Sequence, residues 1–191
     1  MRKPHLFDPK RIAILEMEDR KTWQHPERIL AATEIKHHFV AADLGCGSGV
    51  FTIPLSRKVK KVYGLDVQTE MLELLREKIR KLKIKNIELR LSREDEIPLE
   101  KESVDLLMSI NALHEFNDKQ RMVEEMKRVL KQVGNALIVD FKRKNTGFGP
   151  PISIRLSKKK VISLFEENRF TTLKKQDLPY HYLLVFTKKR S

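Results

Sequence analysis

Val40-Ala41-Ala42-Asp43-Leu44-Gly45-Cys46-Gly47-Ser48-Gly49 is the stretch that decides the fold of this 191-residue chain. Short apolar residues lead to an acid, and three glycines then alternate with other residues. The pattern predicts a buried parallel strand that enters a turn too tight for side chains, with a helix opening at Val50. Glycine tolerates positive φ and lets a ligand lie against bare main chain. Such a turn, after the first strand of an open α/β sheet, commonly holds a nucleotide-like ligand.

Two classes of cofactor-binding loop share this composition, and the spacing of the glycines separates them. The dinucleotide fingerprint G-x-G-x-x-G aims a helix dipole at a pyrophosphate, but Val50 occupies its third glycine position here. The observed spacing, Asp-x-Gly-x-Gly-x-Gly, resembles the first motif of the class I, Rossmann-like S-adenosylmethionine (SAM) methyltransferases. A glycine-rich turn that binds no ligand is the remaining alternative. The resemblance implies SAM as the cofactor, bound by Asp43, Gly45, Cys46, Gly47 and Gly49.

A second acid lies at the distance that a nucleoside-binding sheet requires. Residues 59–66 (V-K-K-V-Y-G-L-D) form a predicted strand that ends at Asp66, 21 residues after Gly45. An acid about 20 residues past the glycine turn accepts hydrogen bonds from the ribose hydroxyls in such folds. Asp66 is also a good N-cap for the helix predicted to follow, and both roles can hold at once. We assign Val67 and Met71, which follow this acid, to the cofactor site as well.

The size and composition of the chain predict a single domain. With 40% hydrophobic residues, 191 residues build one core without help from a metal or a disulfide. The one cysteine, Cys46, cannot form an intramolecular disulfide, which favours a reducing, cytoplasmic location. No apolar run approaches the ~20 residues needed to cross a bilayer. We expect a methyltransferase-like domain over 1–191, with an N-terminal helical cap at 1–36, a Rossmann-like core at 37–191 and no metal.

Strand and helix patterns alternate along the core, which predicts an α/β fold with a doubly wound, mostly parallel sheet. A closing hairpin resembles the usual end of the SAM methyltransferase fold, and implies seven strands in the order 3-2-1-4-5-7-6 with strand 7 antiparallel. In this topology the loops after the first, second, fourth and fifth strands meet the hairpin tip at one edge. Later elements are predicted as helices at 27–36, 117–131 and 158–167, and as strands at 103–110, 135–141, 170–176 and 182–187.

The third strand is predicted at 86–91, and the segment after it departs from the family pattern at one position. Family members often carry Gly-Asp-Ala shortly before a leucine and a proline, and that acid binds the adenine amino group. Aligning the chain on Ile97-Pro98 places Arg93 where the acid is expected. We therefore expect Arg93, its neighbour Glu94 or a backbone group to contact the adenine, or packing alone to hold it. An exposed acidic turn is the alternative for Glu94.

The segment after the fourth predicted strand, Asn111-Ala112-Leu113-His114-Glu115-Phe116, resembles the branch of the ubiquinone and menaquinone C-methyltransferases. There, a polar residue near Asn111 lines the cofactor and a nearby histidine faces the acceptor. An imidazole suits proton transfer because its pKa lies near the operating pH. The hairpin tip adds a hydroxyl and a second imidazole at the same edge. The catalytic candidates are therefore His114, His181 and Tyr180, with a core histidine and a hydrophobic plug as the alternatives.

Two further segments are predicted to cover the site. The loop 143–156 has no regular periodicity and is long for a compact domain, which suggests a substrate lid. Phe7, Arg20 and Trp23 belong to the N-terminal cap that we expect over the cofactor.

The acceptor is predicted to be a small molecule. No Asn/Asp-Pro-Pro-aromatic sequence follows the fourth strand, and Cys46 is misplaced for a cytosine-C5 nucleophile, which disfavours a nucleic-acid base. Residues 142–191 carry 13 Lys and Arg against three acids, within a net charge of +13. A solvated lysine-rich surface explains this surplus. The alternatives are an RNA methyltransferase that docks through this basic quarter, and a SAM-binding protein that transfers no methyl group.

Overall fold

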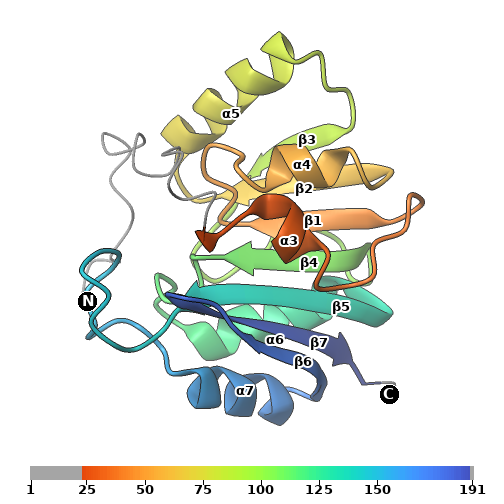
Figure 1. Ribbon diagram of the computed structural model, residues 1–191. Helices are drawn as coiled ribbons and strands as arrows, with labels where there is room; N and C mark the ends of the chain where they lie inside the picture. The colour runs from red at the N-terminus through yellow and green to blue at the C-terminus, as the bar shows by residue number, and fades with distance from the viewer. Residues whose placement is uncertain (1–22, 190–191) are drawn as a thin grey trace.

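The computed structural model describes residues 23–189 and contains one seven-stranded sheet in the order β3-β2-β1-β4-β5-β7-β6. Strands β1 to β5 pair in parallel, and β7 runs antiparallel to both β5 and β6. This confirms the predicted fold class and strand order (Figure 1). The strands are β1 (Val40–Leu44), β2 (Lys61–Asp66), β3 (Ile87–Leu91), β4 (Val104–Ile110), β5 (Leu130–Phe141), β6 (Phe170–Asp177) and β7 (His181–Lys188).

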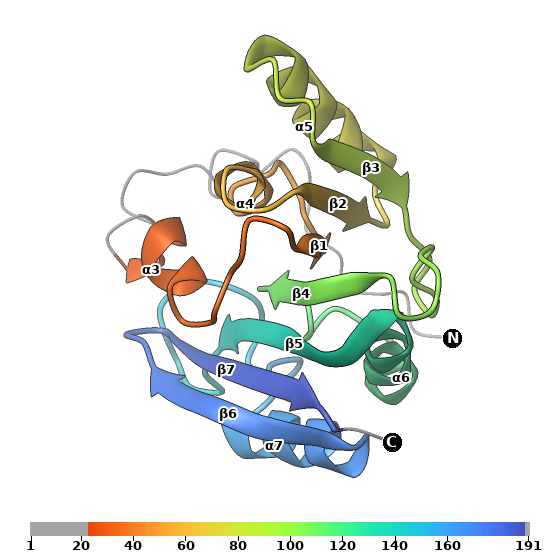
Figure 2. The same cartoon turned by 90° about the vertical axis from the view of Figure 1, so that its right-hand side faces the viewer.

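Helices cover both faces of the sheet, as Figure 2 shows. On one face lie α3 (Pro26–Leu30), α4 (Thr52–Ser56) and α5 (Thr69–Lys81), and on the other α6 (Lys119–Val129) and α7 (Lys158–Glu167). The amphipathic pattern of α6 explains its placement, because its buried residues recur at helical spacing and pack against the sheet. Ser157 caps α7 by accepting a hydrogen bond from the Lys160 backbone N–H.

Several element boundaries differ from the prediction, and three elements illustrate why. Helix α3 ends at Leu30 rather than Lys36, because Ile29 and Leu30 are buried while the residues that follow are exposed or half-buried. Helix α6 begins after Asp118, whose side chain accepts a hydrogen bond from the Arg121 N–H, and ends at Val129. Strand β5 begins five residues earlier than predicted, with a register shift before Asn135. The proposed contacts of Phe7 and Arg20 lie outside the described residues.

The carboxyl ends of the central strands meet the hairpin tip at one edge of the sheet. Strand β1 pairs with β2 and β4, so the glycine loop lies between the ends of those two strands. Farther along, Asp140 pairs with Tyr182 and Phe141 pairs with His181 across β5 and β7. The loop between β5 and α7 extends beyond this edge (Figure 1). The candidate residues from the two halves of the chain are therefore gathered on one side of the molecule.

Candidate cofactor and acceptor site

The glycine loop after β1 is a main-chain turn tied to β2. Gly45, Gly47 and Gly49 all have positive φ, at 78°, 51° and 88°. The N–H groups of Gly45 and Cys46 donate to the Leu65 carbonyl at 2.8 and 3.0 Å. A Cβ added at Gly45 would lie 2.4 Å from the Ala112 Cβ, and one at Gly49 would lie 2.3 Å from Leu75. Glycine is required here by conformation and by close packing.

Asp66 ends β2 and closes the other side of this turn. Its Oδ2 accepts the Gly47 N–H at 2.9 Å, and its Oδ1 accepts the Gln68 N–H at 3.0 Å. The residue is 8% exposed, and burial raises the pKa of its carboxyl above the ordinary value. A carboxylate has about four accepting positions, so each oxygen keeps capacity for a further donor. An acid with spare acceptors beside bare main chain fits a ligand that carries vicinal hydroxyls.

The Asp43 side chain is bonded to the start of α4, and its predicted cofactor contact stays a prediction. Its Oδ2 accepts the Thr52 hydroxyl at 2.6 Å, and this bond ties β1 to the start of α4. The side chain is almost wholly buried, and burial raises the pKa of the carboxyl to about 7. Cys46 contributes through its backbone, while its sulfur is buried with Leu72 and Leu75. These two side chains therefore support the loop from behind.

Asn111 follows β4 in a left-handed conformation, with φ of 58°. Its side-chain amide forms a reciprocal pair with Gln24, at 3.1 and 2.9 Å, and Gln24 is 1% exposed. Its backbone N–H donates to the Val139 carbonyl at 2.8 Å. The amide is thus fixed at the edge where β4 ends. No sequence pattern marks Gln24 as its partner, because 87 residues separate the two.

Arg93 and Glu94 lie on the outer side of the β3 loop. The Arg93 side chain is 80% exposed and lies 3.5 Å from Glu96, and it lines an open groove of about 540 Å³ beside α6. Glu94 accepts a hydrogen bond from the Asn117 amide. The partners of both side chains belong to this loop and to the approach to α6. Their predicted adenine contacts stay predictions.

His114 and Asp140 form a buried pair at the ends of β4 and β5. The imidazole Nδ1 lies 2.7 Å from Asp140 Oδ1, and the His114 backbone N–H donates to Oδ2 at 3.0 Å. Burial alone would lower the pKa of His114, but the charge and hydrogen bond of Asp140, aided by Glu115, raise it above the ordinary value. An imidazole with a fixed carboxylate partner can accept and release a proton.

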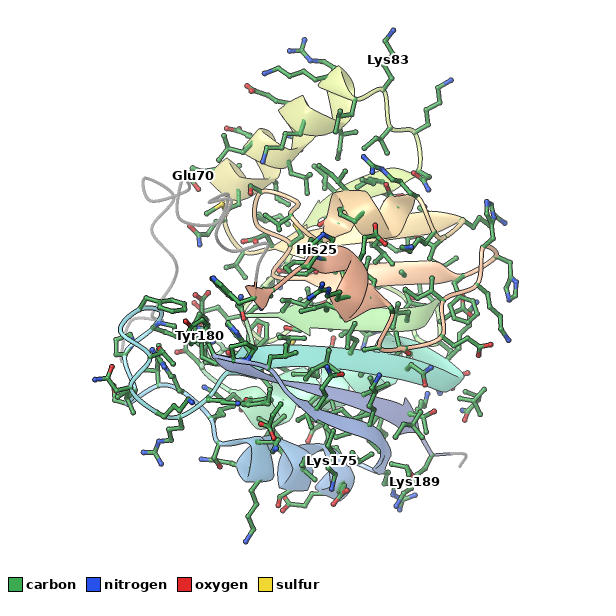
Figure 3. All side chains as sticks on the ribbon, viewed as in Figure 1. His25, Glu70, Lys83, Lys175, Tyr180 and Lys189 are labelled. Carbon is green, nitrogen blue, oxygen red and sulfur yellow. The ribbon has the colours of Figure 1, made fainter. Side chains whose placement is uncertain are left out.

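Aromatic rings fill the space between the hairpin tip and the N-terminal part of the described chain. His181 is fully buried, and the Trp23 ring stacks on it at 5.2 Å with an interplanar angle of 7°. Tyr180 meets Trp23 edge-on at 5.6 Å and Phe148 at 4.7 Å, and Figure 3 shows Tyr180 at the edge where the loop after β5 turns. His181 is therefore part of an apolar wall, which favours the hydrophobic-plug alternative for its ring.

The loop 143–156 is folded around one buried arginine. The Arg155 guanidinium is 5.1 Å from the centre of the Phe141 ring, and the residue is 5% exposed. It donates to the Thr146 hydroxyl at 2.9 Å, and to four backbone carbonyls, those of Lys142, Lys144, Phe148 and Pro150. The loop predicted to act as a lid is thus held together by the hydrogen bonds of this arginine.

The fold and this edge define a class of protein: a Rossmann-like α/β domain whose glycine loop and β2 acid suit a nucleoside-bearing cofactor. A family model described as a methyltransferase domain matches residues 42–138. A SAM-dependent methyltransferase from Aquifex aeolicus is 30% identical, over 95% of this chain and 99% of that one, with a TM-score of 0.89. The chain therefore belongs to the SAM-dependent methyltransferase family, which implies SAM as its cofactor.

Two other relatives extend the comparison. A putative type 11 methyltransferase from Sulfolobus solfataricus is 34% identical, over 80% of this chain and 85% of that one, with a TM-score of 0.67. The demethylmenaquinone methyltransferase of Bacillus mycoides is 28% identical, over 67% of this chain and 54% of its own length. The chain spans about half the length of the curated relatives it matches.

Asp140 and Arg155 lie at the candidate site but are not predicted from the sequence. Asp140 ends an apolar strand, as Asp43 and Asp66 do, and this shared position was the available signal. Arg155 gives no comparable signal, because it stands among the many basic residues of 142–191.

Proposed function

We propose that the protein transfers a methyl group from SAM to a small-molecule acceptor and releases S-adenosylhomocysteine. The observation that carries the proposal is the bond between Gly47 N–H and Asp66 Oδ2, which joins the glycine loop to the β2 acid. This bond holds the glycine loop and Asp66 in a fixed arrangement before any cofactor binds. The family relatives support the same activity.

The cofactor, when bound, supplies an electrophilic methyl group on a sulfonium. The residues of the chain then have to bind, align and exclude water, and alignment alone is worth roughly 7–11 kcal/mol of barrier. Asp66 would accept hydrogen bonds from the ribose hydroxyls, and the glycine loop would lie against the methionine part. Asn111, held by Gln24, would line the cofactor from the β4 side. His114 is our candidate for removing a proton from the acceptor, while the wall of Trp23 and His181 excludes water.

The small-molecule acceptor rests on the compact aromatic wall and on the demethylmenaquinone methyltransferase relative. The RNA alternative rests on the basic surplus after residue 142. Part of that surplus is paired, since Lys142 and Lys158 both contact Asp177, and Lys188 contacts Glu102. Lys189 also lies at the far end of the sheet from Tyr180 (Figure 3). These positions favour the small-molecule acceptor.

The last part of the proposal is the cell compartment in which the protein works. Within residues 23–189, no helix has the length and apolarity to cross a membrane. The free thiol of Cys46 is buried at the cofactor loop, where oxidation would disturb it. We infer that the protein works in the cytoplasm.

The test is transfer of labelled methyl from SAM into fractionated extract of the source cells, with and without RNase. We expect label in an RNase-insensitive small-molecule fraction. Asp66→Ala should abolish it, whereas Glu77→Ala, which removes an exposed acid on α5, should not. Label that disappears with RNase would replace the proposal with the RNA alternative. SAM binding without label in any fraction would leave a SAM-binding protein that transfers nothing.

A further inference from the structure

The Asp140 carboxylate is held in one orientation by donors from two strand ends. Its Oδ1 accepts the Phe141 N–H at 2.7 Å, and its Oδ2 accepts the His114 N–H at 3.0 Å. Backbone N–H groups can only donate, so both oxygens act as acceptors. The residue is 1% exposed. Asp140 therefore presents a fixed accepting oxygen toward the His114 ring.

This orientation decides which ring nitrogen of His114 carries the proton. Nδ1 lies 2.7 Å from Oδ1, and an accepting oxygen at that distance requires Nδ1–H. In the neutral ring the lone pair is then on Nε2. Nε2 is 3.8 Å from Glu115 Oε1, which is too long for a direct hydrogen bond. The Phe141 ring stands edge-on to the imidazole, with the ring centres 6.2 Å apart.

We propose that Asp140 is a positioning residue for methyl transfer: it keeps His114 in the Nδ1–H tautomer, so that Nε2 takes the proton of the acceptor. This inference rests on the proposed function. As the new bond to the methyl group forms, the acceptor atom keeps the electron pair of its broken bond to hydrogen. Sulfur keeps the pair of the broken S–C bond, and the proton moves to Nε2. The acceptor is then a compound whose nucleophilic atom bears a proton, as in a hydroxyl, an amine or an activated C–H.

The surroundings of His114 determine the expected pH dependence. Asp140 on β5 and Glu115 on the same loop raise the pKa of His114, whereas burial and the nearby Lys119 on α6 lower it. A base acts in its neutral form, so kcat should rise with pH through a pKa above the ordinary histidine value of about 6.5. Asp140→Asn removes the charge, so that burial dominates and the pKa falls.

The tautomer can be measured without any acceptor. NMR of protein labelled with ¹⁵N-histidine distinguishes Nδ1–H from Nε2–H, and His114→Gln assigns the signal. We expect Nδ1–H in the wild-type protein, and loss of that preference with a lower pKa in Asp140→Asn. Glu115→Gln, the matched control, should keep the tautomer. Wild-type His114 in the Nε2–H form, or an unchanged tautomer in Asp140→Asn, would overturn the proposal.

Kinetics then separate positioning from a merely structural role. With the labelled fraction as acceptor, Asp140→Asn should lower kcat on the order of 10²-fold, shift the pH profile to lower pH, and leave SAM affinity within about twofold. Equal losses of kcat and SAM affinity would overturn the proposal. The Nδ1–H tautomer without methyl transfer by the wild-type protein would instead overturn the proposed function, while supporting the assignment of the tautomer.

Discussion

The glycine loop after β1 and the loop after β5 lie at the same edge of the sheet, but different parts of the chain shape them. At the glycine loop, main-chain groups make the contacts, and a single added carbon would collide with Ala112. At the loop after β5, a buried Arg155 side chain organises the backbone, and the neighbouring Asp140 side chain holds His114. In line with the proposed function, we call the glycine loop with Asp66 the cofactor half, and the loop after β5 with Asp140 and His114 the acceptor half. The glycine loop itself should be sensitive to added atoms, and the acceptor half to deleted ones.

This difference also fits the chemistry of the two halves. A SAM site receives the same molecule in every family member, so a rigid main-chain surface suffices. An acceptor site has to match one compound, and side chains on loops provide that variety without altering the sheet. The following predictions test the division, starting with the largest expected effect.

Gly45→Ala should destabilise the protein by about 3 kcal/mol or more, because positive φ and a 2.4 Å contact with Ala112 act together. Urea unfolding provides the measurement. Gly147→Ala is the matched control, since Gly147 also has positive φ, 74°, but has open space around it. That variant should lose only about 1 kcal/mol. Equal losses of stability in the two variants would show that close packing against Ala112 does not contribute to the need for glycine at position 45.

Asp43 should make the protein less stable as the pH rises. Its carboxyl pKa is about 7 in the folded state and 3.8 ordinarily, so the folded state holds more protons between these values. The stability that this group contributes is present below about pH 4 and is lost up to about pH 7. Asp43→Asn should remove this slope, on the order of 2–3 kcal/mol between pH 5 and 8. If the stability of the wild-type protein and that of Asp43→Asn, measured by urea unfolding, changed with pH in the same way, the raised pKa of Asp43 would be contradicted.

Arg155→Ala should loosen the loop 143–156 and cost about 2 kcal/mol, since a buried guanidinium with five acceptors is removed. Acceptor KM should rise, while SAM affinity stays unchanged, because the loop belongs to the acceptor half. Arg143→Ala, at an exposed position of the same loop, is the control. Hydrogen exchange of the loop amides reports the loosening directly. A matching loss of SAM affinity would show that the two halves are not separable.

Tyr182→Phe should have the smallest effect. The Tyr182 hydroxyl is buried and has no hydrogen-bond partner among residues 23–189. Burial, with the charge of Asp140, raises the pKa of this phenol, so it stays neutral at every working pH. Its removal should change stability by less than about 1 kcal/mol, toward higher stability. A loss above that amount in thermal unfolding would mean that the hydroxyl has a bound partner.

The glycine turn and the acid that ends β2 were predictable because their signals are local. Gly45, Gly47 and Gly49 lie within five residues of one another, and Asp66 follows at a distance that the βαβ unit fixes. The strand order followed from the alternation of elements and the family resemblance. The partners of Asn111 and His114 were not predictable, because Gln24 and Asp140 lie 87 and 26 residues away. The bond that Asp43 accepts from the Thr52 hydroxyl was not predicted by the motif either.

We propose that Asp66 and the glycine loop bind the cofactor independently of the acceptor half. Isothermal titration of SAM into wild-type protein, Asp66→Ala and His114→Ala tests it most directly, with circular dichroism to verify folding. Asp66→Ala removes the carboxylate that would accept two hydrogen bonds from the ribose hydroxyls. We therefore expect its affinity for SAM to be at least 10²-fold weaker. His114→Ala should bind SAM as the wild-type protein does. Wild-type affinity in Asp66→Ala, or an equal loss in both variants, would contradict the claim.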